Sequence, residues 1–98
     1  MNESLACEAL KNALCMAVNY DGYDRIIEVH TVGYTKKNNL AMRVWQVRGG
    51  SSSGEYTGWK LMTFDKVTSA RITDEASKAP RDGYKKSDEG MSSIIREI

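Results

Sequence analysis

The chain has 98 residues, of which 28% are charged and 41% hydrophobic, and its formal net charge is +1. This length suits one domain with one small core. The weak net charge excludes a polyanion binder that works through its overall field, so any nucleic-acid contact must be local. No apolar run approaches the roughly 18 residues that cross a bilayer. Glu3 and Glu8 interrupt the first apolar stretch, which argues against a signal peptide and for a cytoplasmic protein without a membrane partner.

The first segment, residues 4–14, has the spacing of an amphipathic helix. Apolar residues recur three and four positions apart, and small alanines make one side of the helix flat enough to pack closely on a sheet. These residues are Leu5, Ala6, Ala9, Leu10, Ala13, Leu14 and Ala17.

The two cysteines, Cys7 and Cys15, lie within this helix or at its end. At about 1.5 Å of rise per residue they would be roughly 12 Å apart, too far for a disulfide. His30 is the only histidine, so a zinc site is not indicated. We therefore expect small buried thiols in an intracellular protein, and neither a metal nor a cofactor.

After the helix the apolar period changes to two, which predicts strands. The expected strands are residues 16–20, 25–30, 40–48 and 59–64, and a short one near 67–72. Residues 31–35 continue the second strand or begin a third after a bend at Gly33. Asp21-Gly22 and residues 36–39 are turn signals between strands.

Residues 40–48 are apolar on both faces, so this strand is expected at the centre of the sheet. The barrel interior and the helices would cover its two sides. Gln46 ends one of the apolar rows beside a Gly/Ser loop, and a polar group in that place needs a loop or ligand partner.

A loop of Gly and Ser, residues 49–54, separates two alternating runs that each carry a Trp and a cation. Its backbone N–H groups and hydroxyls suit the close approach of a phosphate or another polar ligand. A mobile hairpin tip without a ligand is the alternative.

The last segment, residues 76–98, begins as a polar extension with the only proline. Met91, Ile94, Ile95 and Ile98 then recur at helical spacing, which predicts a short C-terminal helix with Asp88 as its cap. Together these elements predict one α+β domain, in which an N-terminal helix packs on a small, strongly bent antiparallel sheet or barrel.

The order of these motifs resembles the WYL domain, a small Sm-like β-barrel with an N-terminal helix. The resemblance covers about residues 5–75. It is carried by Tyr20, by Arg25 with Glu28 and His30, and by the segment from Gly58 to Val67. The chain lacks the Trp-Tyr-Leu tripeptide itself, has Val29 where a proline is common, and has no preceding helix-turn-helix. The resemblance therefore implies a stand-alone ligand-sensing module that binds a nucleotide or the end of a single-stranded nucleic acid.

The candidate ligand-binding residues combine this resemblance with strand spacing. The resemblance implies a basic and aromatic pocket formed by Tyr20, Arg25, His30, Gln46, Trp59 and Lys60. Strand spacing adds Arg43 and Arg48, and the Gly/Ser loop adds Ser53. Arginine and lysine would hold a phosphate, and Trp59 or Tyr20 would stack a base.

Each candidate also has a structural interpretation. Arg25 would pair with Asp24 or Glu28, His30 would be a hydrogen-bonded barrel residue, and Trp45 and Trp59 would belong to the core.

Two functions follow from these interpretations. The first is a non-catalytic module that senses or sequesters a nucleotide or short single-stranded nucleic acid, and the second is a protein-interaction or homodimerisation module. An enzyme is not expected, because no nucleophile elbow, phosphate loop or metal cluster is present. Asp21 belongs to a turn, and Glu28 and His30 share strand parity with at most one of the acids Asp21 and Asp24.

Overall fold

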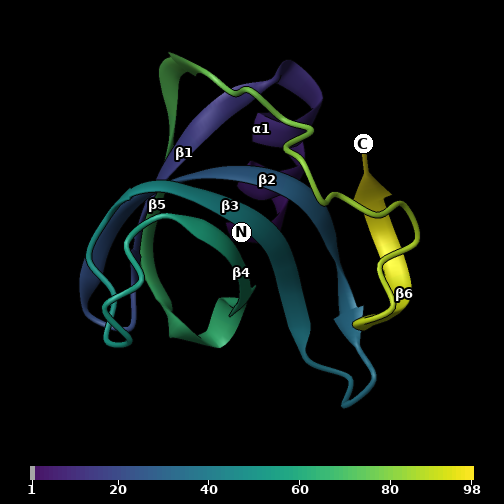
Figure 1. Cartoon of the computed structure of the whole chain (residues 1–98). Helices are drawn as coiled ribbons and strands as arrows, with labels where there is room; N and C mark the ends of the chain where they lie inside the picture. Colours follow the sequence, from purple (N-terminus) through teal and green to yellow (C-terminus); the bar gives the residue numbers. More distant parts are fainter. Residues whose placement is uncertain (1) are drawn as a thin grey trace.

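The computed structural model describes residues 2–98 and contains one helix, one 3-10 turn and six strands (Figure 1). In chain order these are α1 (Asn2–Asn12), β1 (Leu14–Tyr20), β2 (Tyr23–Thr35), β3 (Leu40–Gly49), β4 (Gly58–Thr63), η1 (Phe64–Lys66), β5 (Val67–Ala76) and β6 (Met91–Glu97). The α+β class and the antiparallel arrangement predicted from the sequence are confirmed. No helix among residues 2–98 is long and apolar enough to cross a membrane.

The sheet has the order β4-β3-β2-β1-β5, and β6 adds to β2. The long strand β2 pairs with β1 through its first half and with β6 through its second half, from Thr31 to Thr35. Register shifts near the middle of β2 bend the strand strongly. The sheet curls as expected, but it is not closed into a barrel: within residues 2–98, β4 and β5 each have a single partner strand.

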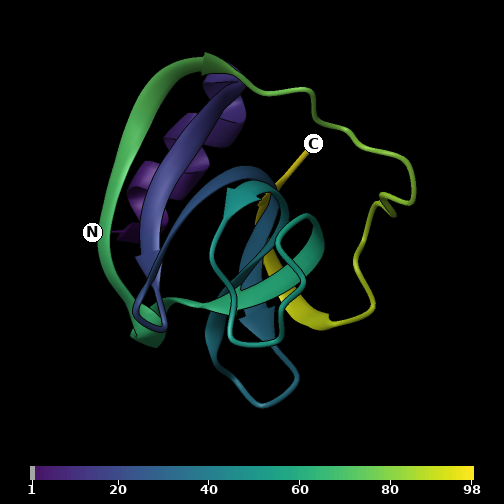
Figure 2. The same ribbon diagram turned by 60° about the vertical axis from the view of Figure 1, so that its left-hand side comes forward.

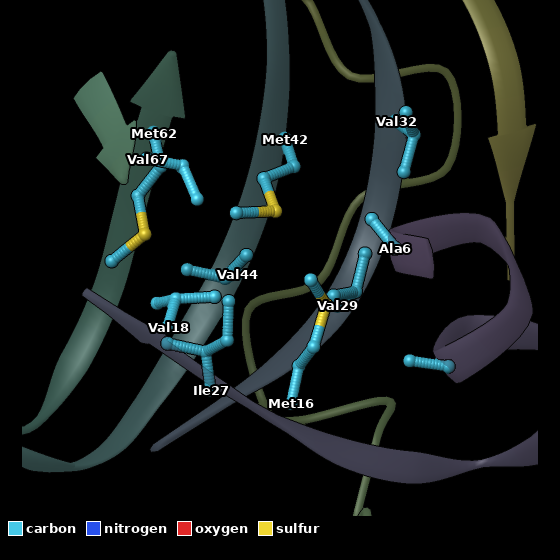
Figure 3. Packing of buried hydrophobic residues seen from close by; sticks show 11 residues of the cluster. Ala6, Met16, Val18, Ile27, Val29, Val32, Met42, Val44, Met62 and Val67 are labelled. Carbon is cyan, nitrogen blue, oxygen red and sulfur yellow. The ribbon is translucent and has the colours of Figure 1, made fainter. Parts of the chain in front are cut away.

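One face of the sheet, here called the core face, packs against α1 (Figure 2). Ala6 and Ala9 of the helix are completely buried, so the flat alanine side allows the close packing predicted for it. The sheet contributes valines, Ile27 and three methionines that point toward one another (Figure 3). Methionine fills irregular gaps well, which suits a sheet that is bent rather than regularly closed.

Two hairpins form at the predicted turns. Asp21 and Gly22 both have positive φ angles, 52° and 85°, which is the two-residue turn that matches the twist of an antiparallel pair. Thr35 and Asn39 close the next hairpin through the Thr35 N–H, which donates to the Asn39 carbonyl at 2.9 Å. Residues 31–35 therefore continue β2 and do not form a separate strand.

Several element boundaries differ from the prediction. The helix ends at Asn12, where Ala13 adopts a left-handed conformation with φ 54°, so Leu14 and Cys15 belong to β1. Both Cys7 and Cys15 are free thiols. Strand β5 extends to Ala76, beyond the short strand expected near residues 67–72.

The predicted C-terminal helix is wrong, because residues 91–97 form β6 (Figure 1). Asp88 therefore caps no helix. It accepts hydrogen bonds from the Arg43 guanidinium and from the Gly90 N–H in the turn that precedes β6.

The face of the sheet opposite the core face, here called the outer face, is partly covered by the segment between β5 and β6. This segment, residues 77–90, is here called the strap. Strand β3 is central as predicted, between β2 and β4, but the strap and not a helix contacts its second face.

Candidate anion-binding site

Arg25 lies on the core face, at the end of the sheet where the β1–β2 turn meets the β3–β4 loop. Its strand neighbour Val18 and the core residue Ile27 share this face by register. The Gly50 N–H donates to the Asp24 carbonyl at 3.1 Å, which ties the start of the Gly/Ser loop to β2. The arginine is therefore held between two connections rather than within the apolar core.

The Arg25 guanidinium is buried: the residue is only 5% exposed. Its Nη2 donates to the Tyr20 carbonyl at 3.1 Å, and its Nη1 donates to Gln46 Oε1 at 3.3 Å. Its Nε has no hydrogen-bond partner among residues 2–98. The rings of Tyr20 and Tyr23 lie 5.0 and 5.6 Å from its central carbon, at cation–π distance.

No carboxylate within residues 2–98 forms an ion pair with this cation. Asp24 instead accepts a hydrogen bond from the Asn19 amide, and Glu28 pairs with Arg81, so neither of the partners considered for Arg25 is used. Burying an uncompensated charge is unfavourable. A buried guanidinium with a free donor and no counterion therefore has the chemistry of an anion site.

Gln46 connects the arginine to the Gly/Ser loop. This fully buried amide accepts from Arg25 and donates from Nε2 to the carbonyls of Gly50 and Tyr56, each at 3.1 Å. The prediction that Gln46 needs a polar partner beside the loop is confirmed. The loop backbone and Arg25 serve as those partners, so Gln46 positions both parts of the site.

Lys60 is on the core face too, because it lies opposite Val44 in the β3–β4 pairing. Its Nζ contacts Ser51 Oγ at 3.4 Å, and Ser51 Oγ lies 2.9 Å from Ser53 Oγ. No carboxylate within residues 2–98 forms an ion pair with Lys60. Tyr20, Arg25, Gln46, Ser53 and Lys60 thus surround one end of the curled sheet and are linked through the loop.

Trp59 and His30 lie on the outer face and are not part of this group. Trp59 is opposite Trp45, with ring centroids 5.5 Å apart, and the His30 ring packs on it at 4.7 Å. Trp59 Nε1 donates to the Asp82 carbonyl at 3.0 Å. The strap therefore uses the Trp59 ring and its donor, and the rings that lie beside Arg25 are those of Tyr20 and Tyr23.

His30 is a hydrogen-bonded residue of the packed interior, as its structural interpretation proposed. Its Nδ1 lies 3.0 Å from the Glu28 carbonyl, and the Arg81 N–H donates to its Nε2 at 3.0 Å. An acceptor on one nitrogen and a donor on the other fix the neutral tautomer that carries its proton on Nδ1. Burial lowers the pKa of His30 below its usual 6.5.

Glu28 lies beside His30 and anchors the strap. The carboxylate is 1% exposed by its side chain, accepts from Arg81 Nε at 2.6 Å and accepts from the Lys78 N–H at 2.7 Å. Arg81 also lies 5.2 Å from the Trp45 ring. These contacts show a structural role for Glu28 and Arg81.

Arg43 and Arg48 have carboxylate partners elsewhere. Arg43 pairs with Asp88 at 2.7 Å at the end of the strap, and this guanidinium holds the pKa of the Asp88 carboxyl below its usual range. Arg48 pairs with Glu75 of β5 at 2.6 Å on the outer face. The predicted residues therefore divide into one connected cluster at Arg25, one strap interface and one separate ion pair.

The sequence interpretation missed Tyr23, Ser51 and Tyr56. Tyr23 precedes Arg25 by two positions in β2, and this spacing puts both side chains on one strand face. The strand period alone would have identified it. Ser51 and Tyr56 lie in the loop, where no period applies, and only the folded contacts bring them to Lys60 and Gln46.

Comparisons of this chain with protein-family models, with curated proteins and with solved structures found no match.

Proposed function

We propose that the protein is a non-catalytic module that senses or sequesters a nucleotide or a short single-stranded nucleic acid through the Arg25 cluster. The observation that carries this proposal is the buried Arg25 guanidinium, which has an unbonded Nε and no carboxylate partner within residues 2–98. A phosphate group supplies the missing negative charge and several acceptor oxygens.

Lys60 and the serines extend this chemistry. The Lys60 ammonium is a second cation on the same face, and its contact with the Ser51 hydroxyl is long enough, at 3.4 Å, to exchange for a phosphate oxygen. The Gly50 and Gly54 N–H groups already donate to the Asp24 and Ser51 carbonyls, so the loop would contact an anion through its serine hydroxyls. One phosphate held between Arg25 and Lys60 would replace weak internal contacts with charge-assisted ones.

Two tyrosines supply the stacking surface that a base requires. Tyr23 and Tyr56 are 40% and 57% exposed and lie on the two connections that flank Arg25. Stacking of a base on an aromatic ring contributes about 1–3 kcal/mol in single-strand binding sites. In this proposal Tyr23 turns away from the guanidinium and opens Nε to the ligand.

The test is a thermal-shift screen of the full chain with mononucleotides, cyclic nucleotides and short oligonucleotides, followed by titration of the best ligand. We expect Arg25→Gln and Lys60→Ala each to weaken binding about 10- to 100-fold, since each removes a charge-assisted contact. Glutamine keeps a donor for the Tyr20 carbonyl, so Arg25→Gln should retain the fold. Raising the salt concentration should weaken binding.

Lys36→Ala is the matched control, because Lys36 is an exposed cation in the opposite hairpin turn. Its affinity should equal that of the wild type. The proposal is overturned if no nucleotide or oligonucleotide raises the melting temperature, or if Arg25→Gln and Lys60→Ala bind as the wild type does.

A homodimerisation or protein-interaction module is the second candidate function, and the sheet edges favour it. Ile95 of β6 is 50% exposed and Leu61 of β4 is 39% exposed, and each of these strands has one partner strand within residues 2–98. An apolar strand edge can pair with a second chain. This function predicts that the elution volume depends on protein concentration and that no nucleotide shifts the melting temperature.

A further inference from the structure

A second concave surface lies on the outer face, away from the Lys60 side of the sheet. It is a groove of about 550 Å³ lined by residues of β1, β2, β3 and β5, among them Ala17, Asp24, Ile26, Arg48, Ser69 and Arg71. This volume lies within the range of about 300–1,000 Å³ that is common for sites of small organic ligands. Arg25 lines it as well, but the Arg25 guanidinium donates to the Tyr20 carbonyl and to Gln46 on the core face.

Strand register explains the groove. Arg48 is opposite Ile26, Ile26 is opposite Ala17, and Ala17 is opposite Arg71, so the four residues form one row across four strands. The two inner positions of the row are apolar and half-buried, and both ends are arginines. The row thus presents an apolar floor between two cations.

Arg48, which lines the groove, is held by an ion pair. Arg48 reaches from β3 to Glu75 of β5 with contacts of 2.6 and 3.0 Å, although β2 and β1 lie between these strands. Both side chains are well exposed, at 57% and 39%. The outer face is therefore hollow here, and the ion pair crosses the hollow at one end of the floor.

The opposite end of the row has an unused cation. Arg71 is exposed and forms no ion pair within residues 2–98. Among the described residues 2–98, Asp24 is the only carboxylate that lines the groove, and it accepts a hydrogen bond from the Asn19 amide. Three arginines within residues 2–98 line the groove: Arg48 is paired with Glu75, and Arg25 directs its guanidinium to the core face. Arg71 is therefore the cation left for a ligand on the outer face, and its planar fork suits a carboxylate or sulfonate.

We infer that this groove binds a small organic anion with an apolar body. The anionic group pairs with Arg71, and the apolar body covers Ile26 and Ala17 as far as the Arg48–Glu75 pair. The inference is independent of the Arg25 cluster, since Arg25 and Lys60 direct their charged groups to the core face of the same sheet.

The test is a fluorescence titration of the full chain with 1-anilinonaphthalene-8-sulfonate, an aromatic sulfonate. Octanoate and octanol serve as competitors of equal chain length with and without the charge. We expect saturable binding that octanoate displaces and octanol does not. Arg71→Ala should weaken binding about tenfold, the usual effect of losing one charge-assisted contact. Ala17→Leu fills the floor and should weaken binding at least as much.

Arg96→Ala on β6 is the control, and it should bind the dye as the wild type does. Near-ultraviolet circular dichroism shows whether each variant keeps its packing, because loosened proteins also bind this dye. The inference is overturned if binding is not saturable, if octanol competes as well as octanoate, or if folded Arg71→Ala and Ala17→Leu bind unchanged. A loss in Lys60→Ala but not in Arg71→Ala would assign the dye to the Arg25 cluster instead.

Discussion

His30 is a candidate ligand-binding residue in the sequence, whereas in the structure its ring packs against aromatic side chains. Its ring is enclosed by the Trp59 ring at 4.7 Å and the Tyr84 ring at 5.4 Å. Both nitrogens are used, one toward the Glu28 carbonyl and one by the Arg81 N–H. A proton added at Nε2 would face another donor, so the neutral ring is part of the folded structure.

This arrangement predicts a loss of stability as pH falls. Burial lowers the pKa of His30 in the folded state, whereas the unfolded chain keeps a value near 6.5. The unfolded state therefore binds more protons than the folded state as pH falls below about 6.5. For each unit by which folding lowers the pKa, the free energy of unfolding decreases by about 1.4 kcal/mol once the pH is below the folded-state pKa. Urea midpoints at pH 7.5, 6.5 and 5.5 test this effect. His30→Gln should flatten the dependence over this range.

Proton NMR gives a direct check, because His30 is the only histidine of the chain. Its ring protons should titrate below pH 6.5. A titration midpoint at or above 6.5 would contradict the enclosed neutral ring.

At the scale of elements, local signals predicted the first half of the fold and failed at the end. Two-residue periodicity and the Asp21-Gly22 turn fixed β1 and β2 within a few residues. In the last segment, Met91 and Ile94 have helical spacing, and register shifts in the β2–β6 pairing are what accommodate this spacing in a strand. The free second half of β2 decided the outcome, because it offers a partner that only the folded chain provides.

The candidate site was predictable to a similar degree. Tyr20, Arg25, Gln46, Ser53 and Lys60 do lie at one end of the sheet, because strand parity and the loop position determine where they point. The strap determines the contacts of His30, Trp59 and Arg43. The strap has no periodic pattern, so the sequence does not predict its path. The ion pair of Arg48 depends on the curl of the sheet.

Gly33 makes the β2–β6 pairing testable. A Cβ atom there would overlap the Ser93 carbonyl oxygen of β6, and this contact is with backbone that cannot rotate away. We expect Gly33→Ala to destabilise the protein by about 2–4 kcal/mol, in the range of overpacked sites. Amide exchange of residues 91–97 should rise more than that of β1. Slow exchange of those amides in a stable Gly33→Ala protein would contradict the tight pairing.

Gly54→Ala is the matched control. Gly54 has open space around it but a φ angle of 80°, so the substitution should cost only about 1 kcal/mol and leave β6 protected.

The whole molecule measures 28 × 27 × 25 Å with a radius of gyration of 11.9 Å, so the strap contributes to a compact shape (Figures 1 and 2). The strap and β6 cover residues that a curled sheet alone would expose, including Glu28, His30 and Thr31, which are all less than 2% exposed. Buried polar groups need hydrogen-bond partners, and the strap supplies them to Glu28 and His30. The last 22 residues are thus expected to belong to the same cooperative unit as the sheet.

Both tryptophans report on the strap, which allows a test of this cooperativity. Arg81 lies over Trp45, and the Asp82 carbonyl accepts from Trp59, whereas far-ultraviolet circular dichroism reports the sheet. We expect the two signals to give the same urea midpoint, as in a two-state transition. Arg81→Ala leaves the Glu28 carboxylate without its cation and should lower both midpoints together. A change in tryptophan fluorescence at lower urea than the sheet signal would contradict this expectation. The strap would then open separately, and the sheet would stay folded with Glu28 and His30 exposed to water.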